Sequence, residues 1–232
     1  MIPDLMRRDT PSNGLPSPTA RIISLRLRGV QRRQLEEAVR SETLVQVAAS
    51  DVLAEETLPR LAARSLWLFV VSAAAYAAVI GLSRQWLHAG QLFGDGPLWL
   101  RIALLAVVNV VGYVVMIPAH EAVHALVILA MGGRPRFGLK LPLAAYCTAP
   151  NQLFMRDGYI TVALAPLVAL SALALVVATL APNIAAGLLL AVAGNVSGAV
   201  GDLEVVQAVR EQKPDTLIAD TATGFIAFRR RD

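Results

Sequence analysis

Two long stretches without charge constrain this chain more than any other feature of its sequence. Between Gly158 and Gly201 there is no Asp, Glu, Lys or Arg, and between Ile102 and Gly133 the single charged side chain is Glu121. A helix needs about 20 apolar residues to cross a bilayer core, and a charge at its centre costs several kcal/mol. Charged residues make up only 16% of the chain, against about 25% in ordinary globular domains. The sequence therefore predicts an integral, multi-pass membrane protein rather than a soluble enzyme.

The apolar blocks are long enough for four membrane-spanning helices, so the predicted fold class is an all-α polytopic membrane protein. We expect Pro182 and Asn183 to form a tight turn between the last two spans, and Pro118 to kink the second. The predicted spans are Leu66–Leu82, Leu98–Met131, Tyr159–Leu180 and Ile184–Leu203.

The distribution of Arg and Lys predicts the orientation of these spans. Basic residues gather before the first span, in the 132–158 loop and at the C-terminus, whereas the opposite loops hold few. Because basic loops stay on the cytoplasmic side, we expect both termini and the 132–158 loop to lie there, with the protein in the cell membrane. The basic residues on this side are Arg60, Arg64, Arg134, Arg136, Lys140, Arg156, Arg229, Arg230 and Arg231.

The chain outside the spans divides by composition. Residues 1–20 are rich in Pro and Ser and are expected to be disordered. Residues 21–64 predict a small cytoplasmic amphipathic appendage, which either rests on anionic headgroups or is a solvated regulatory domain. Residues 65–97 then hold the first span and its loop, and residues 98–232 form the membrane core with a cytoplasmic tail.

Short segments of the predicted cytoplasmic side have strand character. Residues 137–141 and 144–148 predict a short β-hairpin or edge strand, and the tail at 216–229 predicts another with its turn at Thr223 and Gly224. The lone Cys147 would stay reduced in this loop, and a buried small residue is the preferred interpretation. A net charge of +4 gives no reason to expect a nucleic-acid partner.

The second predicted span contains the motif H-E-x-x-H at His120, Glu121 and His124. On a helix the two histidines stand one turn apart on one face and can hold one zinc ion, while the glutamate can take a proton from the water that zinc activates. The alternatives are an interhelical hydrogen-bonding cluster and a proton or ion path. Another divalent metal could also occupy such a site.

Catalytic zinc is usually held by three protein ligands, and the remaining histidine, His88, falls in the opposite loop. A carboxylate is therefore expected as the third ligand. Asp202 is preferred, because the second and fourth spans run in the same direction and Asp202 comes at the same predicted depth as the histidines. The alternatives are Glu204, Asp157 and Asp220, and Asp202 could instead be an ordinary acid at the end of a helix.

Asn195 precedes Asp202 by two helical turns within the fourth predicted span. Its carboxamide could donate a hydrogen bond to an oxyanion and so be catalytic. It could equally cap a helix or bond to a neighbouring helix.

These residues together resemble the site-2-protease-type intramembrane zinc metalloproteases, and more closely the bacterial and archaeal group labelled "putative zincin peptidases". The resemblance covers about residues 98–228. It implies zinc ligands at His120, His124 and Asp202 and a general base at Glu121. The family's usual Asp-Gly pair is absent, since Leu203 follows Asp202. Relatives cleave single-span membrane proteins, and a strand near the site pairs with the unwound substrate, a role that would fall to the 132–158 loop.

The sequence thus predicts an intramembrane zinc metalloendopeptidase whose partners are a membrane protein or peptide substrate and the lipid bilayer. An alternative is a catalytically inactive, metal-binding membrane scaffold or chaperone-like protein. A small transporter is a weaker alternative, because the spans carry too few charged residues beyond the motif for an ion relay.

Overall fold

The computed structural model describes residues 16–17, 19–23, 36–41, 43–90, 95–140 and 144–231. Most of the predicted 1–20 segment and the basic stretch 24–35 of the predicted appendage lie outside the described residues. Two compact units are present. The helical unit comprises 56–123 and 165–201, and the sheet unit comprises the described parts of 1–55, 124–164 and 202–232.

In the described part of the chain, four helices are long and apolar enough to cross a membrane, as many as the spans that we predicted. The first three are α2 (Leu58–Trp86), α3 (Leu98–Ala130) and α4 (Arg156–Leu180), and the fourth candidate covers Leu189–Arg210. Helix α2 has a proline in its first turn, where the missing N–H has no helical partner in any case. Pro118 lies inside α3.

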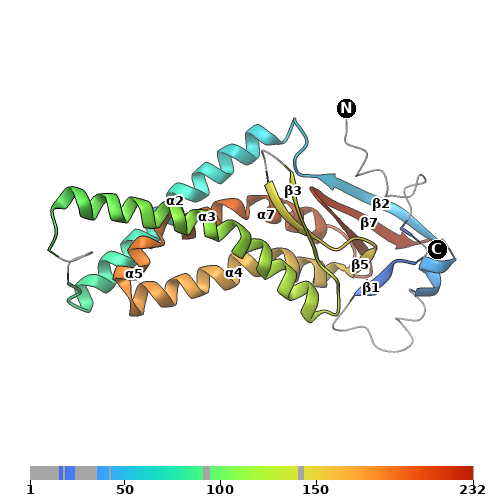
Figure 1. Ribbon diagram of the computed structural model, residues 1–232. Coiled ribbons are helices and arrows are strands. Elements are labelled where there is room, and N and C mark those ends of the chain that lie inside the picture. The colour runs from blue at the N-terminus through green and yellow to red at the C-terminus, as the bar shows by residue number, and fades with distance from the viewer. Residues whose placement is uncertain are drawn as a thin grey trace. The chain divides into compact units, whose positions relative to one another are not determined.

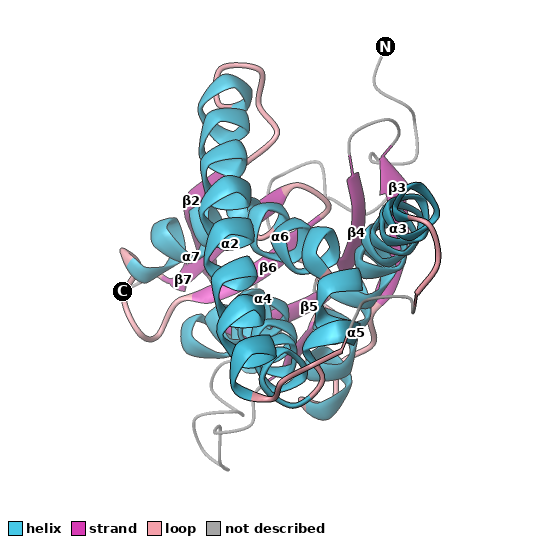
Figure 2. Cartoon of the chain, turned by 90° about the vertical axis from the view of Figure 1, so that its left-hand side faces the viewer, coloured by secondary structure: helices cyan, strands magenta, loops and turns pink. Residues whose placement is uncertain are grey.

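The core of the helical unit is formed where α2 packs against α5 (Pro182–Gly187) and α6 (Leu189–Gly198). Figure 2 shows α2 running alongside α6. Small side chains such as Ala178 and Ala185, which are fully buried, allow this close packing around Tyr76. Large apolar side chains on α2 and α3 instead face outward, as expected for helices whose solvent is lipid.

The fourth predicted span is not one continuous helix. The chain leaves helical geometry at Leu188, between α5 and α6, and again at Ala199, before α7 (Val200–Arg210). Asn109 of α3 explains the first interruption. Its side-chain amide donates to Ala186 O at 3.0 Å, and its Oδ1 accepts from Leu190 N at 2.9 Å. A side chain thus provides bonding partners for backbone groups beside the break.

The sheet unit contains a five-stranded sheet with the strand order β1-β5-β6-β7-β2. The pair β1–β5 is parallel and the other pairs are antiparallel. Figure 1 shows β5, β7 and β2 of this sheet. The strands are β1 (Arg21–Ile23), β2 (Leu44–Asp51), β5 (Gln152–Met155), β6 (Leu217–Thr221) and β7 (Gly224–Arg230).

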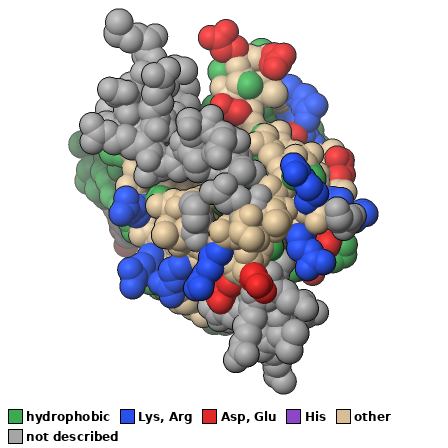
Figure 3. Space-filling view, turned by 90° about the vertical axis from the view of Figure 1, so that its right-hand side faces the viewer, with side chains coloured by type: hydrophobic (Ala, Val, Ile, Leu, Met, Phe, Trp, Pro, Cys, Tyr) green, Lys and Arg blue, Asp and Glu red, His purple; other side chains and the backbone are tan. Residues whose placement is uncertain are grey.

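One face of the sheet packs against the short helical segment at residues 36–40, and its core includes Ile22, Val39, Leu153 and Phe228. The opposite face carries Phe154 and Phe225, whose rings both contact Tyr159 at the start of α4. Figure 3 views the molecule from the right-hand side of Figure 1, and Lys and Arg side chains are visible on that surface. The sheet is therefore a packed layer between apolar groups on both faces.

A separate two-stranded sheet pairs β3 (Arg136–Lys140) with β4 (Ala144–Thr148). This hairpin and the β6–β7 hairpin confirm the strands predicted in the 132–158 loop and in the tail. A Cβ atom at position 138 would collide with the ring of Tyr146 across the hairpin, so the glycine permits that cross-strand contact. The described fold contains more sheet than we predicted, because β1, β2 and β5 gain their stability from partners far away in sequence.

Candidate metal centre

Helix α3 places the side chains of His120 and His124 one turn apart, as the motif predicts. The division between the two units falls between Val123 and His124, inside this continuous helix, so the helix itself sets the spacing of the two histidines. Both side chains are buried, with exposures of 8% and 7%. Buried imidazoles require hydrogen-bonding partners or a metal.

The Nδ1 atom of each histidine lies at hydrogen-bond distance from an oxygen. His120 Nδ1 is 3.0 Å from Asn195 Oδ1, and His124 Nδ1 is 2.9 Å from the carbonyl oxygen of Val162. An amide oxygen and a backbone carbonyl can only accept, so each Nδ1 carries the proton and donates it. A neutral imidazole protonated at Nδ1 has its lone pair on Nε2, which is the form that binds metal ions.

Asp202 lies in the first turn of α7, where an acidic side chain is favoured by the helix dipole. Its Oδ1 is 3.6 Å from His124 Nε2, which is too long for a hydrogen bond. Two ligand atoms bound tetrahedrally to one zinc ion lie about 3.4 Å apart. A lone pair on Nε2 and a carboxylate oxygen at this separation are compatible with a cation bound between them.

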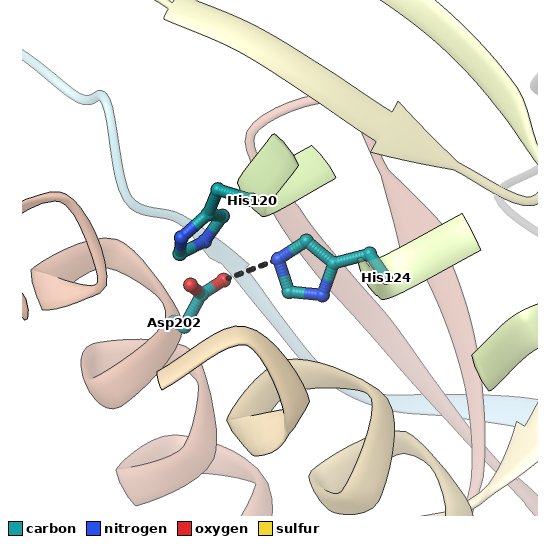
Figure 4. A group of neighbouring side chains, drawn as sticks. All are labelled: His120, His124 and Asp202. Atoms are coloured by element: carbon teal, nitrogen blue, oxygen red, sulfur yellow. Dashed lines mark ion pairs between the residues drawn. The ribbon is translucent and has the colours of Figure 1, made fainter. Parts of the chain in front are cut away.

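One ligand atom from each of His120, His124 and Asp202 lies within 4.8 Å of the other two. Figure 4 shows these side chains and the His124–Asp202 pair. This is the only such group of His, Cys, Asp or Glu in the described part of the chain. Two imidazole nitrogens and one carboxylate form a donor set typical of catalytic zinc, with one coordination position left for water. The residues present therefore fit a zinc ion.

The other predicted alternatives for the third ligand do not belong to this group. Asp157 is an exposed partner of Arg156, with 2.8 Å between Asp157 Oδ1 and Arg156 Nη2. Glu204 is partly buried one turn from the start of α7 but is not part of the metal-binding group.

Asp220 lies on β6 and accepts hydrogen bonds from the Tyr159 hydroxyl and from Ala149 N, at 2.7 and 3.1 Å. Removal from water raises the pKa of Asp220 to about 6, although hydrogen bonds from Tyr159, Thr148 and Ala149 oppose that rise. Asp220 is thus hydrogen-bonded to α4 and to the segment after β4, and it is not a member of the group of possible metal ligands.

Asn195 has two separate environments at its carboxamide. Its oxygen faces His120, whereas its Nδ2 atom is buried without a hydrogen-bond partner, and the whole residue is 2% exposed. Leaving a buried donor unsatisfied costs about 1–3 kcal/mol. Among the described residues, this amide N–H beside a histidine of the motif is therefore a buried donor without its usual partner.

No pattern of residue types could indicate the Val162 carbonyl, because any residue supplies a backbone oxygen. Tyr159 was expected only as the first residue of an apolar span. The Tyr159–Asp220 pair could not be recognised in the sequence, because that requires knowing that β6 lies against the start of α4. The role of Glu121, which is partly buried on α3, stays a prediction.

Comparison with known proteins gives one family. The model of the family described as "Putative zincin peptidase" matches residues 113–217, which include the histidine motif, Asn195 and Asp202. Among curated proteins and among solved structures, no significant match is found. The family match supports a zincin-like metallopeptidase with zinc as its metal.

Proposed function

We propose that this protein is an intramembrane zinc metallopeptidase that hydrolyses peptide bonds of membrane-protein substrates. The observation that carries the proposal is the group of His120, His124 and Asp202, in which both histidines are oriented by a hydrogen bond from Nδ1 to an oxygen. Metal-binding histidines in proteins are oriented in this way. The family match over residues 113–217 supports the same class of reaction.

His120, His124 and Asp202 would hold the zinc ion, which when bound supplies a Lewis acid that makes water a nucleophile near neutral pH. Glu121 is the general base. Its carboxylate accepts the proton of the attacking water and passes it to the departing amine, a contribution of about 10²–10⁴-fold. Glu121 stands between the two histidines in the sequence, which is where the H-E-x-x-H motif has its general base.

Asn195 supplies the second catalytic group. Its buried Nδ2, which has no hydrogen-bond partner in the described structure, donates to the substrate carbonyl oxygen as that oxygen becomes negative. Such a preorganised donor accelerates acyl transfer because it binds the transition state more strongly than the ground state. The cost of leaving the amide unsatisfied in the resting protein is recovered in the transition state.

A membrane protein is the proposed substrate, because the histidines lie on one of the four helices that are apolar enough to span a bilayer. A helical substrate must unwind before water can reach its amide, and an exposed β-strand provides hydrogen bonds for the unwound segment. We assign this role to the β3–β4 hairpin, whose Phe137 and Leu139 side chains are exposed. The proposed orientation has both termini in the cytoplasm.

The test uses detergent-solubilised full-length protein, wild type beside Glu121→Gln, with two probes: fluorescein-labelled casein and a single-span membrane protein tagged at both ends. We expect cleavage by zinc-loaded wild type and none by Glu121→Gln, although the variant keeps its zinc, since an amide cannot carry the proton. Glu55→Gln, a change of an exposed glutamate, is the matched control and should retain activity.

Cleavage by Glu121→Gln at the wild-type rate would remove the proposed base. Wild type that holds zinc but cleaves neither probe would favour the alternative of an inactive, metal-binding membrane scaffold. A scaffold should also support its cellular role when Glu121 is replaced, whereas a peptidase should not.

A further inference from the structure

We propose that Tyr159 and Asp220 form a positioning pair that fixes the carbonyl group of Val162 against His124 and thereby orients this histidine for metal binding. The inference rests on the proposed metal site. It assigns to the sheet unit a part in holding the metal, beyond the residues of the motif. Neither residue of the pair belongs to the group of metal-binding side chains.

The Tyr159 side chain has contacts at both its hydroxyl and its ring. Its hydroxyl donates to Asp220 Oδ1 at 2.7 Å and also lies 3.2 Å from the carbonyl oxygen of Gly224. Its ring contacts those of Phe154 and Phe225, with centroid separations of 5.7 and 6.5 Å. The residue is 6% exposed. Among these contacts, the hydrogen bond to Asp220 is the directional one, so it determines where the hydroxyl end of the ring lies.

Helix α4 connects Tyr159 to the metal-binding group through the carbonyl of Val162. Residues 159 and 162 are three apart on α4 and therefore lie on the same side of the helix. The carbonyl of Val162 accepts the hydrogen bond from His124 Nδ1 at 2.9 Å. Anchoring Tyr159 thus sets the height and rotation of the helical turn that contains this carbonyl.

The start of α4 is bonded to the sheet unit at a second place. Arg156 N donates to Thr216 O at 3.1 Å, and Arg156 Nη1 donates to Gln212 O at 2.9 Å. These bonds hold the end of the helix. The Tyr159–Asp220 bond lies about one turn further along, and a second point of attachment determines the direction of the helix axis as well as the position of its end.

Asp220 connects three elements through one carboxylate. It is part of β6, it bonds to Tyr159 of α4, and its Oδ2 accepts from Ala149 N just after β4. A carboxylate placed among apolar groups is expensive for folding, and an apolar residue of similar size would pack here at lower cost. Its presence is explained by the geometry that it imposes on α4 and on the end of the β3–β4 hairpin.

The experiment compares zinc affinity and thermal stability in wild type, Tyr159→Phe and Phe154→Leu. Tyr159→Phe removes only the hydroxyl. Phe154→Leu disturbs the same aromatic packing but leaves the hydroxyl and its bond to Asp220 intact. Affinity is measured by competition with a chromophoric chelator, and the protein is also loaded with Co²⁺ so that its visible spectrum reports the ligand geometry.

We expect Tyr159→Phe to weaken zinc binding about tenfold, at the lower end of the effect of outer-shell partners of metal ligands, and to alter the Co²⁺ spectrum. Phe154→Leu should lower the melting temperature more than Tyr159→Phe does, yet keep wild-type affinity and spectrum. A second variant, Asp220→Ala, removes the acceptor and should behave like Tyr159→Phe. The double variant should lose no more affinity than the weaker-binding single variant, because the two residues act as one unit.

The inference is overturned if Tyr159→Phe and Asp220→Ala bind zinc as wild type does, or if affinity in all three variants simply follows melting temperature. Wild type that binds no zinc would instead be a failure of the proposed function, so the two failures are distinguishable.

Discussion

Replacing Asn195 separates the two roles that its carboxamide has in this account. Asn195→Ala removes the oxygen that accepts from His120 Nδ1, while Asn195→Asp keeps an oxygen acceptor but removes the orphaned Nδ2. We therefore expect Asn195→Ala to lose metal affinity. Asn195→Asp should keep its metal but lose peptidase activity, because the donor to the oxyanion is gone.

The expected loss of metal affinity in Asn195→Ala follows from the burial of Asn195 and His120. Loss of an outer-shell partner of a metal-binding histidine typically costs 10–100-fold in affinity, which is about 1.4–2.8 kcal/mol. Asn195 and His120 are 2% and 8% exposed, so bulk water has little access to replace the lost acceptor. We expect Asn195→Ala to fall in the upper half of that range.

The assay is zinc competition with a chromophoric chelator in detergent, followed by peptidase measurement on the zinc-loaded proteins. Ser197→Ala is the matched control, because Ser197 is buried on the same helix and its hydroxyl donates only to the backbone oxygen of Gly194. Wild-type affinity in Asn195→Ala would refute the claim that this amide orients His120. Equal loss of metal in Asn195→Asp and Asn195→Ala would refute the separation of roles.

Two further predictions concern stability. Asn109→Leu should destabilise the protein by about 2–4 kcal/mol, because Ala186 O and Leu190 N lose their side-chain partner beside the helix break; an unchanged thermal midpoint would contradict this role. The pKa of Asp220 in the folded protein, about 6, lies above its ordinary value of 3.8, so the stability that its proton contributes is complete below pH 3.8 and is lost as the pH rises through 6. In metal-free protein, the melting temperature of wild type should therefore fall relative to that of Asp220→Asn as the pH rises from 4.5 to 7, by the equivalent of about 3 kcal/mol at most. A difference in melting temperature that stays constant over this pH range would contradict the prediction.

The four candidate membrane-spanning helices and the histidine motif could be predicted because their signals are local. An uncharged stretch such as 159–200 needs no knowledge of its surroundings to predict a span. The spacing of His120 and His124 fixes one shared helix face in the same way. Predicting Asp202 required only the direction of two spans and the depth of one residue.

The five-stranded sheet could not be predicted in full because its pairings join distant parts of the chain. Leu44 of β2 pairs with Arg230 of β7, and Arg21 of β1 pairs with Gln152 of β5. Strand β1 has only three residues, too few to show the alternation that marks a half-buried strand. Its stability comes from tertiary pairing and not from its own propensity.

The break at Leu188 is a second feature that could not be predicted from the sequence. Gly187 stands directly before the break, but Gly194 lies inside α6, so a glycine in this stretch does not by itself mark an interruption. The interruption is accommodated by Asn109 from another helix. The partners of the histidines show the same limit. The Val162 carbonyl could belong to any residue, so only the packing of α4 against α3 identifies it.

The central claim is tested most directly by measuring metal content in detergent-purified wild type, His120→Ala and Asp202→Ala by plasma mass spectrometry. Asp157→Ala is the matched control, since it removes an exposed carboxylate outside the metal-binding group. We predict about one zinc ion per chain in wild type and in Asp157→Ala, and loss or marked weakening in the other two variants. Zinc retained in Asp202→Ala would remove Asp202 as the third ligand, and wild type that holds no metal after zinc is supplied would contradict the account.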